Sequence, residues 1–195
     1  MPRIFVAIPL SPDAAAALER ALPDLPALRR VSPDLMHVTL AFVGQVADDR
    51  VPAIADATTV AAASHGPFDL ALDRIGRFPG HGPPRTIWAG MGPAAADAVI
   101  RLGASVRAEL LRHRVQFDAK PLRAHVTLAR VRDGTSTDEA RVVAAAVNAA
   151  RLPHALTFRA ASVHVMESVL SSKGPRYSSR GEIPLAGPPG AIAGG

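Results

Sequence analysis

A six-residue string in the first quarter of the chain recurs almost unchanged in the second half. Five of the six residues are identical between His37-Val38-Thr39-Leu40-Ala41-Phe42 and His125-Val126-Thr127-Leu128-Ala129-Arg130. In an extended strand, residues i and i+2 project from the same face, so each copy presents an imidazole beside a hydroxyl while its Val and Leu point the other way. The fold must therefore contain two similar strands, each with one face in a core and one polar face left open.

The elements around the two copies follow a similar order, which indicates an internal duplication. In the first half the pattern predicts strands over 4–10, 28–31, 36–43 and 68–78, with helices over 11–22 and 48–63. In the second half it predicts strands over 86–91, around 125–130, over 155–167 and over 177–183, with a helix from 94 and another from a capping box at Ser136 and Glu139 to 150. The Pro/Gly cluster over 79–84 separates the halves.

We therefore predict a single domain over residues 1–185, with halves of about 1–80 and 85–185 related by a pseudo-twofold axis. The Gly-, Pro- and Ala-rich end, 186–195, is expected to be disordered.

Composition narrows the chemistry. The 195 residues include no Cys, which excludes disulfides, thiolate metal sites and Cys nucleophiles. No apolar run approaches the roughly 20 residues of a membrane helix, and we expect a cytoplasmic monomer without membrane contact. The net charge of +5 comes mostly from Arg, which favours an anionic partner, although an Ala- and Arg-rich composition also follows from a GC-rich genome.

If the two halves face each other, the two His-x-Thr faces line one cleft. Two imidazoles on opposite sides of a ligand suit acid/base catalysis, because a neutral His accepts a proton and a charged one donates it. Thr39 and Thr127 would donate hydrogen bonds to phosphate oxygens, which Val could not do. A metal pair is disfavoured, since neither motif contains a third His or a carboxylate at ligand spacing. The alternative is a pair of hydrogen-bonded core histidines.

Together, the strings HVTLAF and HVTLAR, the opening Arg3-Ile4-Phe5-Val6-Ala7-Ile8-Pro9-Leu10 and the ending Glu167-Ser168-Val169-Leu170-Ser171-Ser172-Lys173-Gly174-Pro175-Arg176-Tyr177 resemble the 2H phosphoesterase superfamily. Within it, the sequence is most similar to the RNA 2′,3′-cyclic phosphodiesterases, historically called 2′-5′ RNA ligases. The resemblance implies an α+β fold of two antiparallel-sheet lobes with outer helices and a V-shaped central active cleft. It also implies that strands can be exchanged, so that sequence halves need not equal lobes.

The resemblance further implies hydrolysis of the 2′,3′-cyclic phosphate of an RNA end or nucleotide to a 2′-phosphomonoester, without metal or other cofactor. One motif His would protonate the departing 3′ oxygen and the other would activate water. We expect His37 to be the proton donor and His125 the proton acceptor. Two other functions stay open: joining of RNA ends through a 2′-5′ linkage on the same site, and a non-catalytic module that binds RNA ends.

Further residues around the motifs carry more specific expectations. Arg130 matches a family position expected near phosphate, yet strict strand alternation from His125 sends it to the opposite face, so that only a bulge or a strand end would bring it round. Phe42 has the same parity problem and is expected in the core rather than stacked on a base. Tyr177 is a second base-stacking candidate, and Trp88 is expected in the core. Ala124 stands where related sequences often carry Pro before the second His.

Overall fold

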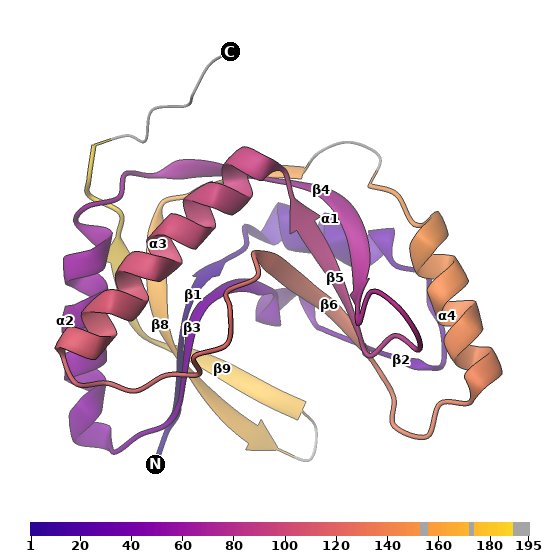
Figure 1. Cartoon of the computed structure of the whole chain (residues 1–195), viewed down its shortest axis with the longest axis horizontal. Helices are drawn as coiled ribbons and strands as arrows, with labels where there is room; N and C mark the ends of the chain where they lie inside the picture. Colours follow the sequence, from indigo (N-terminus) through magenta and orange to yellow (C-terminus); the bar gives the residue numbers. More distant parts are fainter. Residues whose placement is uncertain (153–155, 172–173, 189–195) are drawn as a thin grey trace.

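The computed structural model describes residues 1–152, 156–171 and 174–188, and shows an α+β fold built on an antiparallel sheet (Figure 1). The strands are β1 (Arg3–Pro9), β2 (Leu28–Arg30), β3 (His37–Gln45), β4 (Phe68–Phe78), β5 (Thr86–Met91), β6 (His125–Val131), β7 (Leu156–Ala160), β8 (Ser162–Ser171) and β9 (Gly174–Pro184). The helices are α1 (Pro12–Ala21), α2 (Val51–Ala62), α3 (Pro93–Arg112) and α4 (Thr137–Ala149), with short 3-10 turns at Pro33–Leu35 and Asp48–Arg50.

Two of the helices begin at the caps that the sequence predicts. The Ser11 side chain accepts a hydrogen bond from the Ala14 backbone N–H, and Pro12 fills the first helical position, where no N–H is needed. At α4, the Ser136 hydroxyl and the Glu139 carboxylate form the reciprocal capping box. These local signals fix where the helices start, so that the chain re-enters the sheet at defined points.

The strands lie in the order β7-β4-β5-β6-β3-β1-β8-β9, with β2 paired to β6. The two motif strands, β3 and β6, are neighbours at the centre and join two half-sheets. Around this junction β6 corresponds to β3, β5 to β1, β4 to β8 and β7 to β9. This arrangement has the pseudo-twofold symmetry that the repeat predicts.

The half-sheets do not coincide with the sequence halves. The strands β8 and β9, from the second half, pair with β1, while β4, from the first half, pairs with β5 and β7. Helix α3 follows β5 yet packs on β3, and α1 follows β1 yet contacts β7. In Figure 1, α2 and α3 lie at one end of the molecule and α4 at the other. Exchanged strands and crossing helices therefore tie the two lobes together.

One predicted strand is wrong. The single strand expected over 155–167 is two strands, β7 and β8, which separate at Ala161 and pair in different half-sheets. Ala186 and Gly187, which were expected to be disordered, are held in place, because their N–H groups bond the carbonyls of Ala62 and His65. Residues 189–195 lie outside the described residues. None of the helices that the structure describes is long and apolar enough to cross a membrane.

Candidate active site

The four polar positions of the repeat lie on one face of the central strands. Along β3 and β6, His37, Thr39, His125 and Thr127 are partly exposed, whereas Val38, Leu40, Val126 and Leu128 are buried in the core. This is the alternation that the sequence predicts for a half-buried strand. We call the face with the two His and two Thr the histidine face.

The pairing of β3 with β6 brings the two motifs together. The strands are antiparallel, with Val38 opposite Val126. Continuing that register by one residue places His37 opposite Thr127 and Thr39 opposite His125, all on the histidine face. The two histidines are diagonal neighbours, a relationship that separates Cα atoms by about 7–8 Å. Each histidine therefore stands opposite the threonine of the other motif in the register of the two strands.

The same kind of hydrogen bond, from the ring to a backbone carbonyl two residues earlier, holds both imidazoles. The Nδ1 atom of His37 lies 2.7 Å from the Leu35 carbonyl, and the Nδ1 atom of His125 lies 2.7 Å from the Arg123 carbonyl. A carbonyl oxygen only accepts, so Nδ1 carries the proton in each ring. The Nε2 atom of each ring is then left to accept a proton when the ring is neutral, or to donate one when it is charged.

The surroundings lower the pKa of both histidines. For His37, burial disfavours the charged ring most strongly, the bond to the Leu35 carbonyl opposes this, and the charge of His125 lowers the pKa further. For His125, burial again dominates, the bond to Arg123 opposes it, and the positive charges of Arg123 and Arg130 add to the lowering. The repulsion from His125 means that the two imidazoles are close enough for one to influence the titration of the other.

Matching β-bulges turn the ends of both motifs. In β3, Thr39 pairs with Ala7 but Ala41 pairs with Val6, so Leu40 is an extra residue. In β6, Thr127 pairs with Trp88 but Ala129 pairs with Ile87, so Leu128 is extra. Each bulge leaves two successive residues facing the core and reverses the alternation beyond them.

The reversal brings Phe42 and Arg130 to the histidine face. Arg130 is exposed and its charge acts on His125, while Phe42 is only half-buried and lines the groove described below. The expectation that Phe42 belongs to the core is wrong, because it assumed unbroken alternation. The bulge that Arg130 required is present.

Aromatic rings flank each histidine. The His37 ring lies 4.8 Å from Phe5 and 5.5 Å from Tyr177, measured between ring centroids. The His125 ring lies 5.3 Å from Phe78, edge to face. The Arg123 guanidinium sits 5.0 Å from the centroid of Phe78. These contacts fix the ring planes that the Nδ1 bonds alone would leave free to tilt.

A groove of about 360 Å³ opens beside His125 and Thr39. Its other lining residues are Phe42, Arg107, Asp118, Lys120, Pro121, Leu122 and Arg123. Three of these are cationic, and the carboxylate of Asp118 is paired with Lys120 at 3.0 Å. A larger hollow of about 770 Å³ also has Phe42 in its lining and is bordered by Arg3, Asp48 and Glu167. The smaller groove is the candidate active site, because Thr39 and Phe42 of the first motif and His125 of the second line it.

Trp88 is not a core residue as expected. It pairs with Thr127 and lies on the histidine face, with its indole ring across Gly76 and Gly90, where a Cβ atom would collide with it. Glycines inside strands mark such close approaches, so the spacing of Gly76 and Gly90 around Trp88 was the signal available in the sequence. The sequence patterns also did not identify Arg107, Lys120 and Arg123 as groove residues. They lie before the second motif in the chain, and no local sequence pattern connects them with the site.

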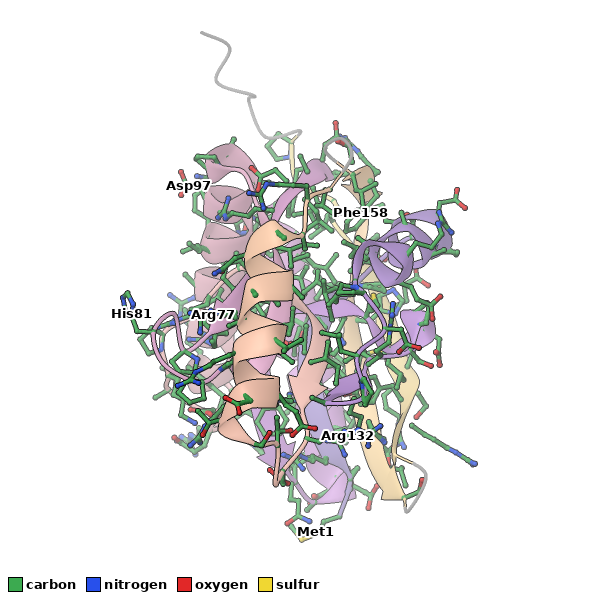
Figure 2. The ribbon with its side chains drawn as sticks, turned by 90° about the vertical axis from the view of Figure 1, so that its right-hand side faces the viewer. Met1, Arg77, His81, Asp97, Arg132 and Phe158 are labelled. Atoms are coloured by element: carbon green, nitrogen blue, oxygen red, sulfur yellow. The ribbon has the colours of Figure 1, made fainter. Side chains whose placement is uncertain are left out.

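His81 lies in the loop between β4 and β5 and is exposed. Figure 2 shows it projecting from the outer edge of the molecule, away from the central strands. Within residues 1–152, 156–171 and 174–188, no cluster of three or more His, Cys, Asp or Glu side chains could hold a metal ion.

The chain matches a family model and is similar to several known proteins. Residues 8–88 and 91–177 match the model of the LigT-like phosphoesterase family. A relative from Geobacillus stearothermophilus, named RNA 2′,3′-cyclic phosphodiesterase, is 30% identical over 95% of this chain, which spans 58% of that protein's length. A relative of the same name from Thermus thermophilus is 33% identical over 66% of this chain and 68% of its own.

Solved structures show the same fold. The crystal structure of TT0787 from Thermus thermophilus superimposes with a TM-score of 0.77 over 95% of this chain and 98% of that one, at 25% identity. LigT from E. coli, solved in complex with 3′-AMP, superimposes with a TM-score of 0.69 over 95% of this chain and 99% of that one, at 23% identity. The α+β fold that the resemblance implies is confirmed, and the chain belongs to the LigT-like phosphoesterase family.

Proposed function

We propose that the protein hydrolyses the 2′,3′-cyclic phosphate of an RNA end or nucleotide to a 2′-phosphomonoester, by two-histidine acid/base catalysis that needs no metal. One observation carries this proposal: two imidazoles with tethered Nδ1 atoms lie diagonally across a pair of strands, each opposite a threonine hydroxyl. The names of the relatives support the substrate class.

In this reaction the bond between phosphorus and the 3′ oxygen breaks, and a new bond forms between phosphorus and the oxygen of water. His37 donates the proton that the departing 3′ oxygen needs, and His125 takes a proton from the water. The positive charges of Arg123 and Arg130 favour the neutral form of His125, as a base requires. His37 leaves the reaction neutral and His125 charged, and exchange with solvent restores both.

The remaining side chains hold the substrate. Thr39 and Thr127 donate hydrogen bonds to the non-bridging phosphate oxygens, where negative charge develops. Arg130 balances that charge from the end of β6. Tyr177, against His37, and Phe42, in the groove wall, offer surfaces on which the nucleobase stacks.

The test is incubation with a 2′,3′-cyclic nucleotide in excess chelator, with the product identified by phosphorus NMR. We expect the 2′-phosphomonoester, and loss of about 10²- to 10⁴-fold in kcat for His37→Ala or His125→Ala with the fold intact. A 3′-phosphate product, or complete loss of activity to chelator, would contradict the proposal.

A second candidate is the joining of RNA ends through a 2′-5′ linkage, with a ribose hydroxyl in place of water. The groove favours this candidate because it extends from His125, the proposed base, past Phe42, Pro121 and Leu122, which could receive a nucleoside. Halves of a cleaved RNA would then yield a joined product. A module that only binds RNA ends would show no turnover, and its binding would survive either His→Ala change.

A further inference from the structure

In each of the two bulges, the backbone carbonyl of the extra residue accepts a hydrogen bond. The donor differs between the two bulges. In β6, the Leu128 carbonyl accepts a hydrogen bond from the Val31 backbone N–H, next to β2, at 2.8 Å. In β3, the Leu40 carbonyl accepts one from Nε of Arg107, on α3, at 3.0 Å. The donor to the carbonyl of the extra residue is therefore a backbone N–H in β6 and the Arg107 side chain in β3.

The same guanidinium holds the segment that leads into the second motif. We call residues 115–124 the strap. Nη1 of Arg107 donates to the Lys120 carbonyl at 2.8 Å. Arg107 thus lies between the carbonyls of Leu40 and Lys120, two acceptors that cannot bond to each other. It joins the strap to the His37 strand and also keeps the two apart.

Two other contacts anchor the strap. The Asp118 N–H donates to the Phe42 carbonyl at 2.8 Å, beyond the bulge. Leu122 packs against Gly103 of α3, where a Cβ atom would collide with it. The groove lies between these anchors, and Arg107 forms part of its wall.

The position of the strap matters because it runs directly into His125. The Arg123 carbonyl at its end receives Nδ1 of His125. Ala124 precedes the histidine, and Ala leaves the backbone angle φ free where Pro would fix it. The approach to His125 therefore depends on contacts made elsewhere in the strap.

We propose that Arg107 is a positioning residue, whose guanidinium acts as a spacer that sets the strap at a fixed distance from β3 and so fixes both the groove and the placement of His125. The inference rests on the proposed function for its activity measurement, and a second measurement does not depend on that function.

The experiment compares Arg107→Lys and Arg107→Met with the matched control Arg50→Met. Arg50 also donates to two backbone carbonyls, those of His113 and Arg114 at 3.0 and 3.1 Å, at the C-terminal end of α3 and outside the groove lining. Lys keeps the charge without the fork that reaches two acceptors. Melting temperatures are measured for all three, and Arg107→Lys carries the comparison if Arg107→Met does not fold.

On a 2′,3′-cyclic nucleotide, we expect kcat to fall about tenfold to hundredfold in both Arg107 variants, because small displacements of catalytic groups cost this much. Arg50→Met should keep kcat within about twofold of the parent at a similar loss of melting temperature. Wild-type kcat in Arg107→Lys, or an equal loss in Arg50→Met, would overturn the proposal. A third result would also overturn it: Arg107→Met raises KM without changing kcat, and Arg107→Lys has the KM of the parent. That pattern would indicate that the charge of Arg107 binds phosphate directly.

The second measurement is titration of the His125 ring by NMR. Burial is the main cause of its lowered pKa, so a loosened strap that admits water should raise the pKa in Arg107→Lys, where the charge is unchanged. Superimposable titrations of the variant and the parent would overturn the inference. If the parent protein turns over no cyclic phosphate, the proposed function fails, and this titration still decides the role of Arg107.

Discussion

At the scale of single residues, the site consists of two equivalent halves. Each motif supplies one imidazole, tethered through Nδ1 to the carbonyl two residues earlier, and one threonine that stands opposite the histidine of the other motif. The equivalence extends to the burial that lowers both histidine pKa values. Differences in role must therefore come from neighbours, and Arg123 and Arg130 are the charged neighbours that act on His125.

The two threonines should contribute about equally. We expect Thr39→Val and Thr127→Val each to lower kcat/KM about tenfold to hundredfold, because each removes one donor to the phosphate and keeps the side-chain shape. Steady-state kinetics on a cyclic nucleotide measure this effect. Thr157→Val, at an exposed position of β7, is the matched control and should change nothing. Parent-like kinetics in both motif variants would remove the threonines from the site.

The pH dependence follows from the histidine environments. The base must be neutral, so the rate falls as pH drops below its pKa, and the acid must be charged, so the rate falls as pH rises above its pKa. Both pKa values are lowered from the ordinary value of about 6.5, so we expect the maximum of kcat/KM below about pH 6.5.

A bound phosphate favours the charged imidazoles, so the maximum of kcat should lie at higher pH than that of kcat/KM. Full pH profiles of both constants check the prediction. A kcat/KM maximum on the alkaline side of neutrality would show that the free site does not hold its histidines as the structure indicates.

At the scale of the elements, the bulges are what sequence reasoning could not supply. Strands, caps and helix positions follow from local patterns, and most were predicted correctly. Strict alternation, however, sends Phe42 and Arg130 away from the site, and the bulges at Leu40 and Leu128 bring them back. The pair of adjacent apolar residues Leu-Ala in both copies was the available signal, since a half-buried strand has no other reason to break its alternation there.

A substitution of Arg130 tests the role of the bulge at Leu128. We expect Arg130→Gln to lower kcat/KM about tenfold to hundredfold, because a charged hydrogen bond to phosphate is worth about 1.5–3 kcal/mol. The comparison is Arg159→Gln, an exposed arginine of β7 that pairs with Asp69. If the two variants behave alike in steady-state kinetics, Arg130 is an ordinary strand-end arginine.

At the scale of the whole molecule, the sequence predicts the duplication but not how the strands of the two halves pair. The repeat predicts two similar halves and a pseudo-twofold axis, and the strand order has that symmetry. Which strands pair depends on contacts between distant segments, such as β1 with β8, that no local pattern encodes. The strand expected over 155–167 illustrates this, since its two parts serve different half-sheets.

The same exchange explains how the two motifs come together. Since β3 and β6 join the half-sheets, the candidate site lies on the junction itself, and helix α3 packs against β3 there. A cleft shared by two lobes usually depends on how the lobes are oriented. Here the backbone pair of Val38 and Val126 fixes the register of the two motifs directly.

The most direct test of the account is a crystal structure of the protein with inorganic phosphate. It predicts one phosphate between β3 and β6, with Nε2 of His37 and Nε2 of His125 on different oxygens, each within the 2.6–3.2 Å or so of a hydrogen bond. Phosphate bound to only one imidazole, or to neither, would contradict the claim that the two histidines act on a single phosphorus atom.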